Sequence, residues 1–222
     1  MRLLSVNLGR AKAVPYTDNP EGVTGIDKRP VEGPVRVAAP GPKGIGGSGL
    51  AGDAVCKRQH HGGDDQAVYA MAREDLDEWE RALGRPLADG AFGENLTTAG
   101  LDVSGALIGE RWRIGSGVVL EITCGRIPCM TFQGHLGEQR WVKRFTERGA
   151  PGAYLRVIAP GEIRAGDPVE IVHRPDHDVT VALQFRAVTT HRELLPRLLA
   201  AGEALHPESL AAARKYSTEH GG

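Results

Sequence analysis

Apolar and polar residues alternate most clearly between Val118 and Cys124, and this run is rich in β-branched side chains. A period of two residues predicts a strand with one buried face. Gly125 allows the chain to bend, and Pro128 has no amide hydrogen for a neighbouring strand, so the strand should end here. Cys129 is then expected on a loop just beyond a rigid strand end.

Shorter apolar runs recur at spacings of roughly 8–15 residues with glycine-containing turns between them, which favours a closed or nearly closed β-barrel over alternating βαβ units. Residues 108–114 look like part of a meander of short antiparallel strands. The clearest of the other predicted strands are residues 3–7, 35–38, 154–158 and 169–172.

Apolar residues recur at helical spacing over residues 66–83, and a short helix with an apolar side is expected over 139–148. An Ala/Leu-rich composition predicts two more helices, over 193–201, which Pro196 interrupts, and over 207–215. The longest predicts an amphipathic helix from Gln66 to Leu83. The last two follow a polar stretch, His173–Asp178, that has the composition of a linker. We therefore predict a mainly β fold with flanking helices, in which a β-barrel domain spans residues 1–175 and a small helical extension spans residues 176–222.

Composition narrows the possible partners. The chain has 222 residues, 25% charged and 41% hydrophobic, which suits one sizeable core. The net charge of −1 and pI near 6.7 give no overall field that would attract nucleic acid or an acidic membrane. The first apolar stretch is too short for a signal peptide, and no run reaches the roughly 18 apolar residues of a membrane span. We expect a cytoplasmic protein with neither nucleic acid nor membrane as partner.

The three cysteines, Cys56, Cys124 and Cys129, lack the paired spacing of a structural zinc site. Cys129 is the most informative of them, because Arg126 lies three residues before it. A neighbouring guanidinium depresses the pKa of a thiol and increases its thiolate character, as a metal ligand or a nucleophile requires. The alternative is that Cys129 is a small buried hydrophobic residue, as unpaired cysteines commonly are.

Residues 41–49 form a glycine-rich loop that formally satisfies the G-x-G-x-x-G pattern. We reject a dinucleotide site here, because Pro40 and Pro42 separate the glycines from the preceding strand and no amphipathic helix follows them. The loop is expected to be a mobile surface insertion.

A second glycine pair, in His61-Gly62-Gly63, lies directly before the predicted helix, which Asp64 or Asp65 can cap. Backbone N–H groups at such a helix start form an anion site that suits a phosphate, and the histidine adds a donor. A tight turn followed by ordinary capping explains the same residues. A divalent metal held by the two aspartates and the histidine pair at 60–61 is a further alternative.

Glu94 and Asn95 offer paired hydrogen-bonding groups next to Gly93, within a loop-like segment that spans residues 89–101. A glycine at this place permits another group to approach closely. The alternative for these residues is turn formation without contact to a ligand.

Five motifs follow one another along the chain, namely Thr24-Gly25-Ile26-x-Lys28, His61-Gly62-Gly63-x-x-x-Ala67-Val68-Tyr69, Gly90-x-Phe92-Gly93-Glu94-Asn95-Leu96-Thr97, Ile108-Gly109 and Arg126-x-Pro128-Cys129. In this order they resemble one known family, the MOSC domain, and its YiiM-like branch in particular, over roughly residues 2–172. The predicted C-terminal helices resemble the three-helix extension that follows the domain in that branch. The sequence departs from the branch at Cys124-Gly125, where a Gln-Pro-like pair is usual, and in the insertion at 41–49.

The resemblance implies a domain that binds molybdenum cofactor, a pterin dithiolene that carries molybdenum and a terminal phosphate. It implies that Cys129 is both the catalytic residue and the protein thiolate on molybdenum, a soft ligand that suits this metal. Arg126 and Lys28 would neutralise anionic charge, and Glu94 and Asn95 would bond either the pterin or their own loop. The full set implied to bind the cofactor is Lys28, His61, Gly62, Gly63, Gly93, Glu94, Asn95 and Arg126.

On this resemblance we expect an oxidoreductase that reduces N-hydroxylated small molecules, such as hydroxylaminopurines or amidoximes, by oxygen-atom transfer to molybdenum. The sequence contains no flavin, haem or iron–sulfur motif, so the electrons would come from a separate reductase. Two alternatives stay open. In the first, Cys129 carries a persulfide in a sulfur-carrier or cofactor-handling module. In the second, the protein is an adaptor whose helical tail docks a partner.

Overall fold

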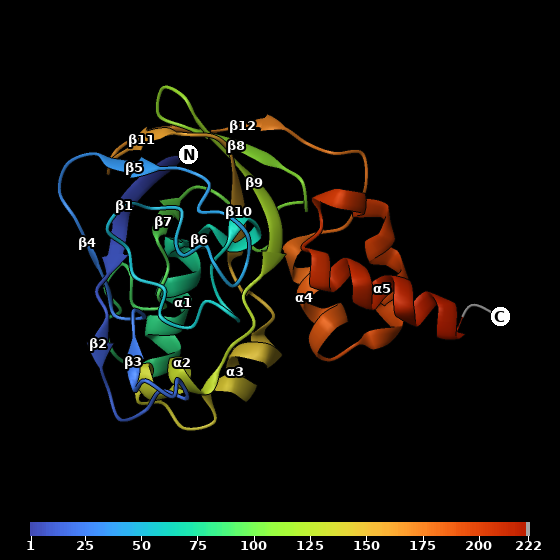
Figure 1. The fold of residues 1–222 in the computed structure, drawn as a ribbon, viewed down its shortest axis with the longest axis horizontal. Coiled ribbons are helices and arrows are strands. Elements are labelled where there is room, and N and C mark those ends of the chain that lie inside the picture. Colours follow the sequence, from blue (N-terminus) through green and yellow to red (C-terminus); the bar gives the residue numbers. More distant parts are fainter. Residues whose placement is uncertain (221–222) are drawn as a thin grey trace.

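The computed structural model describes residues 1–220 and is built on one eight-stranded mixed sheet (Figure 1). Its strand order is β12-β8-β9-β10-β6-β7-β1-β4, and every neighbouring pair is antiparallel except β6 with β7. The strands of this sheet are β1 (Arg2–Gly9), β4 (Lys28–Pro30), β6 (Val68–Ala72), β7 (Leu96–Ala99), β8 (Arg111–Ile114), β9 (Val118–Gly125), β10 (Ala153–Ala159) and β12 (Val169–His173). Two small antiparallel sheets accompany it, formed by β2 (Lys12–Ala13) with β3 (Val23–Thr24) and by β5 (Val35–Val37) with β11 (Gly161–Ile163).

The predicted closed barrel is wrong, although the prediction of a mainly β fold with flanking helices is confirmed. Within residues 1–220, the edge strands β4 and β12 do not pair with each other. An isolated bridge from Arg2 to Pro168 brings the start of β1 to the turn before β12, without extending into a ladder. β4 has only three residues and ends at Pro30, which lacks an amide hydrogen and so cannot continue a ladder.

β9 lies where the alternating pattern predicts it and ends at Gly125. The prediction of a single buried face is wrong, because Glu121 and Thr123 on the other face are 6% and 0% exposed. The Glu121 carboxylate accepts hydrogen bonds from Arg111 at 2.6 Å and from Arg156 at 3.3 Å. These partners allow a charged side chain to be buried in the middle of the sheet.

The helix predicted over Gln66–Leu83 is wrong in its first part. A single 3-10 turn, η1 (Asp64–Gln66), leads into strand β6, and only then does helix α1 (Arg73–Leu83) begin. All five residues of β6 are buried between β10 and β7. The run Val68-Tyr69-Ala70-Met71 fits both the helical and the strand period. It forms a strand because it pairs with β10 on one side and β7 on the other.

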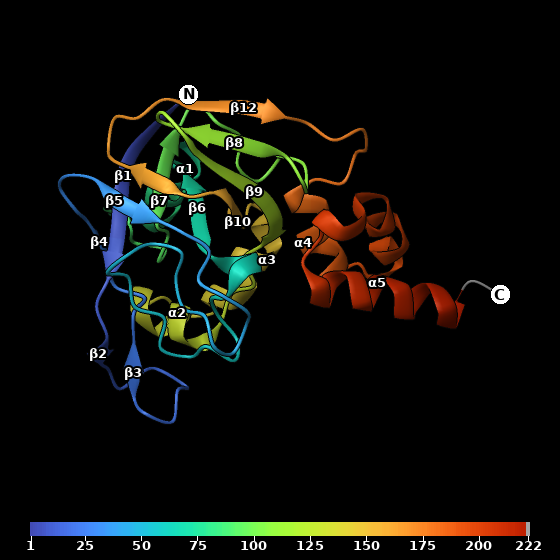
Figure 2. The same cartoon turned by 45° about the horizontal axis from the view of Figure 1, so that its top comes forward.

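Helix α2 (Met130–Leu136) was not predicted and begins directly after Cys129, whereas α3 (Trp141–Arg148) matches the prediction for residues 139–148. The C-terminal part forms α4 (Val181–Thr189), the 3-10 segment η2 (Arg192–Ala204) and α5 (Pro207–His220). These three pack together on one side of the sheet, next to β9 (Figures 1 and 2).

The C-terminal helices share one apolar core with the sheet. Val181 and Leu183 of α4 and Leu198 of η2 belong to the same buried cluster as Leu120 and Ile122 of β9. Among residues 1–220, the helices are all too short or too polar to cross a membrane.

Candidate functional site

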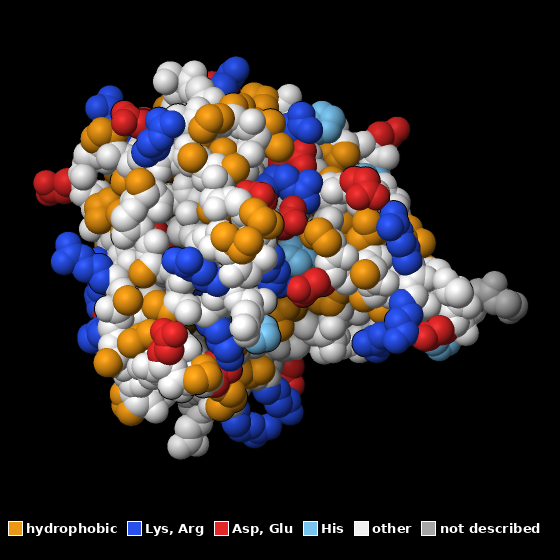
Figure 3. All heavy atoms as spheres, in the orientation of Figure 1, with side chains coloured by type: hydrophobic (Ala, Val, Ile, Leu, Met, Phe, Trp, Pro, Cys, Tyr) orange, Lys and Arg blue, Asp and Glu red, His pale blue; other side chains and the backbone are white. Residues whose placement is uncertain are grey.

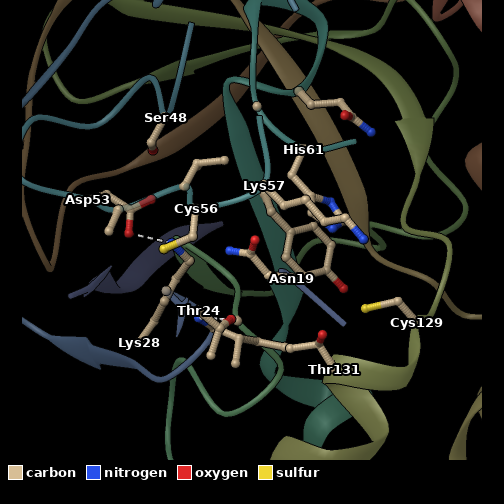
Figure 4. A pocket seen from close by; sticks show the side chains of 18 of the residues that line it. Asn19, Thr24, Lys28, Ser48, Asp53, Cys56, Lys57, His61, Cys129 and Thr131 are labelled. Carbon is tan, nitrogen blue, oxygen red and sulfur yellow. Dashed lines mark hydrogen bonds and ion pairs between the residues drawn. The ribbon is translucent and has the colours of Figure 1, made fainter. Parts of the chain in front are cut away.

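One cavity brings together residues that are far apart in the sequence (Figure 4). Its walls are formed by the segments around residues 17–28 and 48–69, by the loop at 93–95, and by the chain from the end of β9 to the start of α2. Gly63 and Glu94 lie outside this lining. The predicted site residues that line the cavity are Lys28, His61, Gly62, Gly93, Asn95, Arg126 and Cys129.

Cys129 occupies the position before the first residue of α2, with extended backbone angles. Its carbonyl oxygen accepts a hydrogen bond from the Gln133 amide at 3.1 Å, which starts the helix. The side chain is half-buried and faces the cavity from the α2 side in Figure 4. A thiol at this place can be reached from the cavity, while the helix holds its backbone.

Arg126 places a buried positive charge in the wall of the cavity, since only 6% of the residue is exposed. Its guanidinium carbon lies 4.2 Å from the ring centre of Phe132 and 5.1 Å from that of Tyr69, and the group donates to the Phe92 carbonyl. Burial alone would lower the pKa of Arg126, but the hydroxyls of Tyr154 and Tyr69 and the Cys129 thiol raise it above its ordinary value. The guanidinium of Arg126 therefore stays protonated and positively charged.

Lys28 is buried and paired with Asp53, whose side chain is only 1% exposed. Burial lowers the pKa of Lys28, and the Asp53 carboxylate opposes that shift. The same carboxylate accepts a hydrogen bond from the Gly9 amide at 2.7 Å and from Asn95 Nδ2 at 2.9 Å. Asn95 Oδ1 in turn accepts from the Tyr69 amide at 3.2 Å. This network fixes one wall of the cavity.

Glu94 bonds to its own loop. Its carboxylate accepts hydrogen bonds from the Gly90 amide at 2.5 Å, the Phe92 amide at 2.9 Å and the Thr97 hydroxyl at 3.0 Å. Burial raises the pKa of Glu94 to about 7 in spite of these donors. Of the two roles left open for Glu94, the geometry favours the shaping of the loop that carries Gly93.

His61 and Gly62 line the cavity, whereas the Gly63 amide is bonded to the Gly47 carbonyl at 3.0 Å. Burial lowers the pKa of His61 to about 4, with a further contribution from Arg126, so the ring is neutral at neutral pH. The element whose start was predicted to bind phosphate is only the three-residue 3-10 turn η1, because the residues after it form β6.

The glycine-rich loop 41–49, expected to be a mobile surface insertion, is hydrogen-bonded to other segments at several points. The Gly41 amide donates to Asp64 at 2.9 Å, and Gly47 accepts from Gly63. A side chain at Gly63 would lie 2.7 Å from the Lys43 backbone. The glycines therefore allow two stretches of backbone to pack closely, and Ser48 lines the cavity.

The other two thiols differ from Cys129. Cys124 is 4% exposed and lies outside the cavity lining, and burial raises its pKa to about 12. Cys56 does line the cavity, on the side of Lys28 and Asp53 in Figure 4, and burial raises its pKa. Among residues 1–220, no group of three or more His, Cys, Asp or Glu side chains is placed to hold a metal ion.

Several lining residues were missed by the sequence analysis, namely Asp53, Lys57, Gln66, Tyr69 and Tyr154. Tyr69 lies within one of the motifs that carry the resemblance, so a signal for it existed. No such signal pointed to Asp53, because its role depends on Lys28, 25 residues away, and on Asn95, 42 residues away.

Comparison with known proteins identifies the class to which this fold and cavity belong. A family model described as the MOSC domain matches residues 57–170. The chain is 34% identical over 184 residues to the uncharacterized protein YflK of Bacillus subtilis, a match that covers 83% of this chain and 79% of YflK. The chain therefore belongs to the MOSC domain family, as its motifs predict.

Within that family the chain is YiiM-like. It superposes on the crystal structure of YiiM from Geobacillus stearothermophilus with a TM-score of 0.76 and 25% identity, over 97% of this chain and 98% of that one. It is also 31% identical over 177 residues to a protein of Gibberella moniliformis named Reductase, but it spans only 29% of that protein's length. Family membership associates the chain with the molybdenum cofactor.

Proposed function

We propose that the protein is a molybdenum cofactor-dependent oxidoreductase that reduces N-hydroxylated compounds. The observation that carries this proposal is a single cavity that holds the half-buried Cys129 thiol together with the buried cations of Arg126 and Lys28. A soft thiolate suits molybdenum, and fixed cations suit the anionic groups of a pterin dithiolene phosphate. The name of the fungal relative, Reductase, supports a reductive reaction.

The residues present fit this cofactor in a second respect. Gln66 lines the cavity, and its buried Oε1 atom has no hydrogen-bond partner in residues 1–220. A buried acceptor without a partner is costly, and an N–H group of a pterin ring would satisfy it. The cavity measures about 110 Å³. Ligand pockets usually reach roughly 300–1,000 Å³, so a pterin would also occupy the open mouth.

Each residue has a defined part in this proposal. Cys129 would hold molybdenum through its thiolate, and Arg126 would balance anionic charge. Lys28, whose charge Asp53 already offsets, and neutral His61 would each donate a hydrogen bond. The bound cofactor supplies two-electron chemistry in which the oxygen of an N–O bond is accepted and water is released. The electrons would come from a separate reductase, which stays a prediction.

The test is an activity assay of the purified full-length protein from a host that makes the cofactor. Reduced methyl viologen would supply electrons, and a hydroxylaminopurine or an amidoxime would be the substrate. We expect conversion to the amine or amidine that is abolished in Cys129→Ser and retained in Cys124→Ser. A persulfide on Cys129 without bound pterin, detected by mass spectrometry, would favour the sulfur-carrier alternative and contradict the proposal.

A further inference from the structure

The C-terminal helices bond directly to the end of β9, the strand that leads to Arg126 and Cys129. Gln184 of α4 accepts a hydrogen bond from the Gly125 amide at 2.8 Å, and the His206 amide donates to the Thr123 carbonyl at 3.1 Å. Buried backbone groups require partners, so the last residues of β9 depend on this extension for two of theirs. Gly125 immediately precedes Arg126.

Gln184 is fixed from both sides. The residue is 2% exposed, and its Nε2 atom donates to the Ser209 hydroxyl of α5 at 2.9 Å. Its amide therefore joins two C-terminal helices to the backbone of β9. The fit is close, because a side chain at Gly125 would lie 3.2 Å from Cγ1 of Val181 and 2.8 Å from Pro151.

A second contact from the extension reaches the glycine-rich loop. Glu208 at the start of α5 pairs with Lys43 at 2.5 Å, and Lys43 packs against Gly63 beside the cavity. The two charged side chains are 71% and 29% exposed, so this pair contributes little to stability. Basic and acidic side chains are mixed over the face drawn in Figure 3. The buried Gln184 bond is therefore the stronger connection.

We propose that Gln184 is a positioning residue, which sets the backbone of the segment from Gly125 to Cys129 and with it the place of the thiol in the cavity. The C-terminal helices are then part of the framework of the site. The relevance of this role to catalysis rests on the proposed function, but the positioning itself does not, because it concerns only contacts within the chain.

The experiment measures how fast iodoacetamide alkylates each cysteine of the full-length protein, with the products quantified by peptide mass spectrometry. Gln184→Leu removes both hydrogen bonds of the side chain. We expect the alkylation of Cys129 to become about fivefold faster, as the loss of the buried hydrogen bond to the Gly125 amide allows. Cys56, on the opposite wall, should keep its rate. Gln184→Glu retains an acceptor for Gly125 and should restore the rate at Cys129.

Two further variants keep the test decisive. Thr180→Ala removes the hydrogen bond from the Leu183 amide that caps α4, yet it leaves β9 untouched, so it should not alter Cys129. Ser209→Ala is milder than Gln184→Leu and should accelerate Cys129 in the same direction. An unchanged Cys129 rate in both Gln184→Leu and Ser209→Ala would overturn the proposal.

Equal acceleration of Cys129, Cys56 and the buried Cys124 would also overturn it, because that result reports general loosening of the fold. The experiment needs no molybdenum. Absence of cofactor from the wild-type protein would therefore refute the proposed function without affecting this inference, and an unchanged thiol rate would refute this inference alone.

Discussion

At the scale of single residues, the site combines buried charges whose cost is met in different ways. Arg126 is covered by aromatic rings, Lys28 is paired with Asp53, and Glu94 is surrounded by donors of its own loop. Burying a charge is expensive unless it is paired or hydrogen-bonded. These residues are therefore expected to influence folding stability as well as the cavity.

Glu94 should make stability depend on pH. Burial raises its pKa from the ordinary 4.5 to about 7, so the folded state binds the proton more tightly than the unfolded state does. The stabilising contribution of Glu94 is then fully present below pH 4.5 and is lost as the pH rises through 7. The loss amounts to about 3 kcal/mol in the free energy of unfolding. Urea unfolding of the wild type and of Glu94→Gln, compared between pH 4 and pH 8, measures this change in the free energy of unfolding. A difference between the two proteins that does not change with pH would contradict the assignment.

Asp53 should contribute to folding stability through its ion pair with Lys28. Asp53→Ala leaves a buried, unpaired ammonium group, and we expect it to lower the free energy of unfolding by about 3–5 kcal/mol. The double variant Lys28→Met/Asp53→Ala removes both charges and should recover part of that loss. Denaturant unfolding of Lys28→Met, Asp53→Ala and the double variant gives the interaction energy between the two side chains. Strictly additive effects would show that the two side chains do not interact.

At the scale of elements, sequence reasoning succeeded where one period dominates and failed where two fit. The alternation from Val118 to Cys124 located β9 and its end, and hence Cys129. The stretch from Val68 to Ala72 was assigned to a helix, because its apolar residues also fit a helical face and the neighbouring strands of a sheet leave no local trace. The prediction of a closed barrel failed for a similar reason. Whether the edge strands pair with each other depends on contacts between residues far apart in the sequence.

The contact between the glycine-rich loop and Gly63 gives a matched pair of variants. Gly63 and Gly44 both have positive φ angles, of 78° and 89°. A Cβ at Gly63 would lie 2.7 Å from the Lys43 backbone, whereas one at Gly44 would meet nothing within 4 Å. Gly63→Ala should therefore be less stable than Gly44→Ala by about 1–3 kcal/mol. Thermal unfolding measures both, and equal melting temperatures would contradict close packing of the loop.

At the scale of the whole molecule, the C-terminal helices and the sheet form one core. The apolar residues of α4 and η2 belong to the buried cluster of β9. This arrangement argues against an adaptor whose tail can be removed freely. The sequence indicated that such helices exist and that the motifs belong to one family. It did not indicate their hydrogen bond to β9, because that bond joins Gln184 to Gly125, which are 59 residues apart.

Deletion of residues 179–222 should consequently abolish cooperative unfolding, because the apolar surface of β9 would be exposed to water. A control that lacks only residues 219–222 should unfold like the full chain. Circular dichroism during thermal unfolding compares the two. Retention of a cooperative transition by the shorter chain would indicate that residues 1–178 fold alone.

The central claim is that Cys129 holds a pterin-bound metal in the cavity shared with Arg126 and Lys28. The most direct measurement is the molybdenum and pterin content per chain of wild type, Cys129→Ser and Cys124→Ser, each purified from the same cofactor-competent host. We expect bound molybdenum and pterin in the wild type and in Cys124→Ser, with the metal lost or inert in Cys129→Ser. Wild-type protein without molybdenum, or an equally loaded and active Cys129→Ser variant, would contradict it.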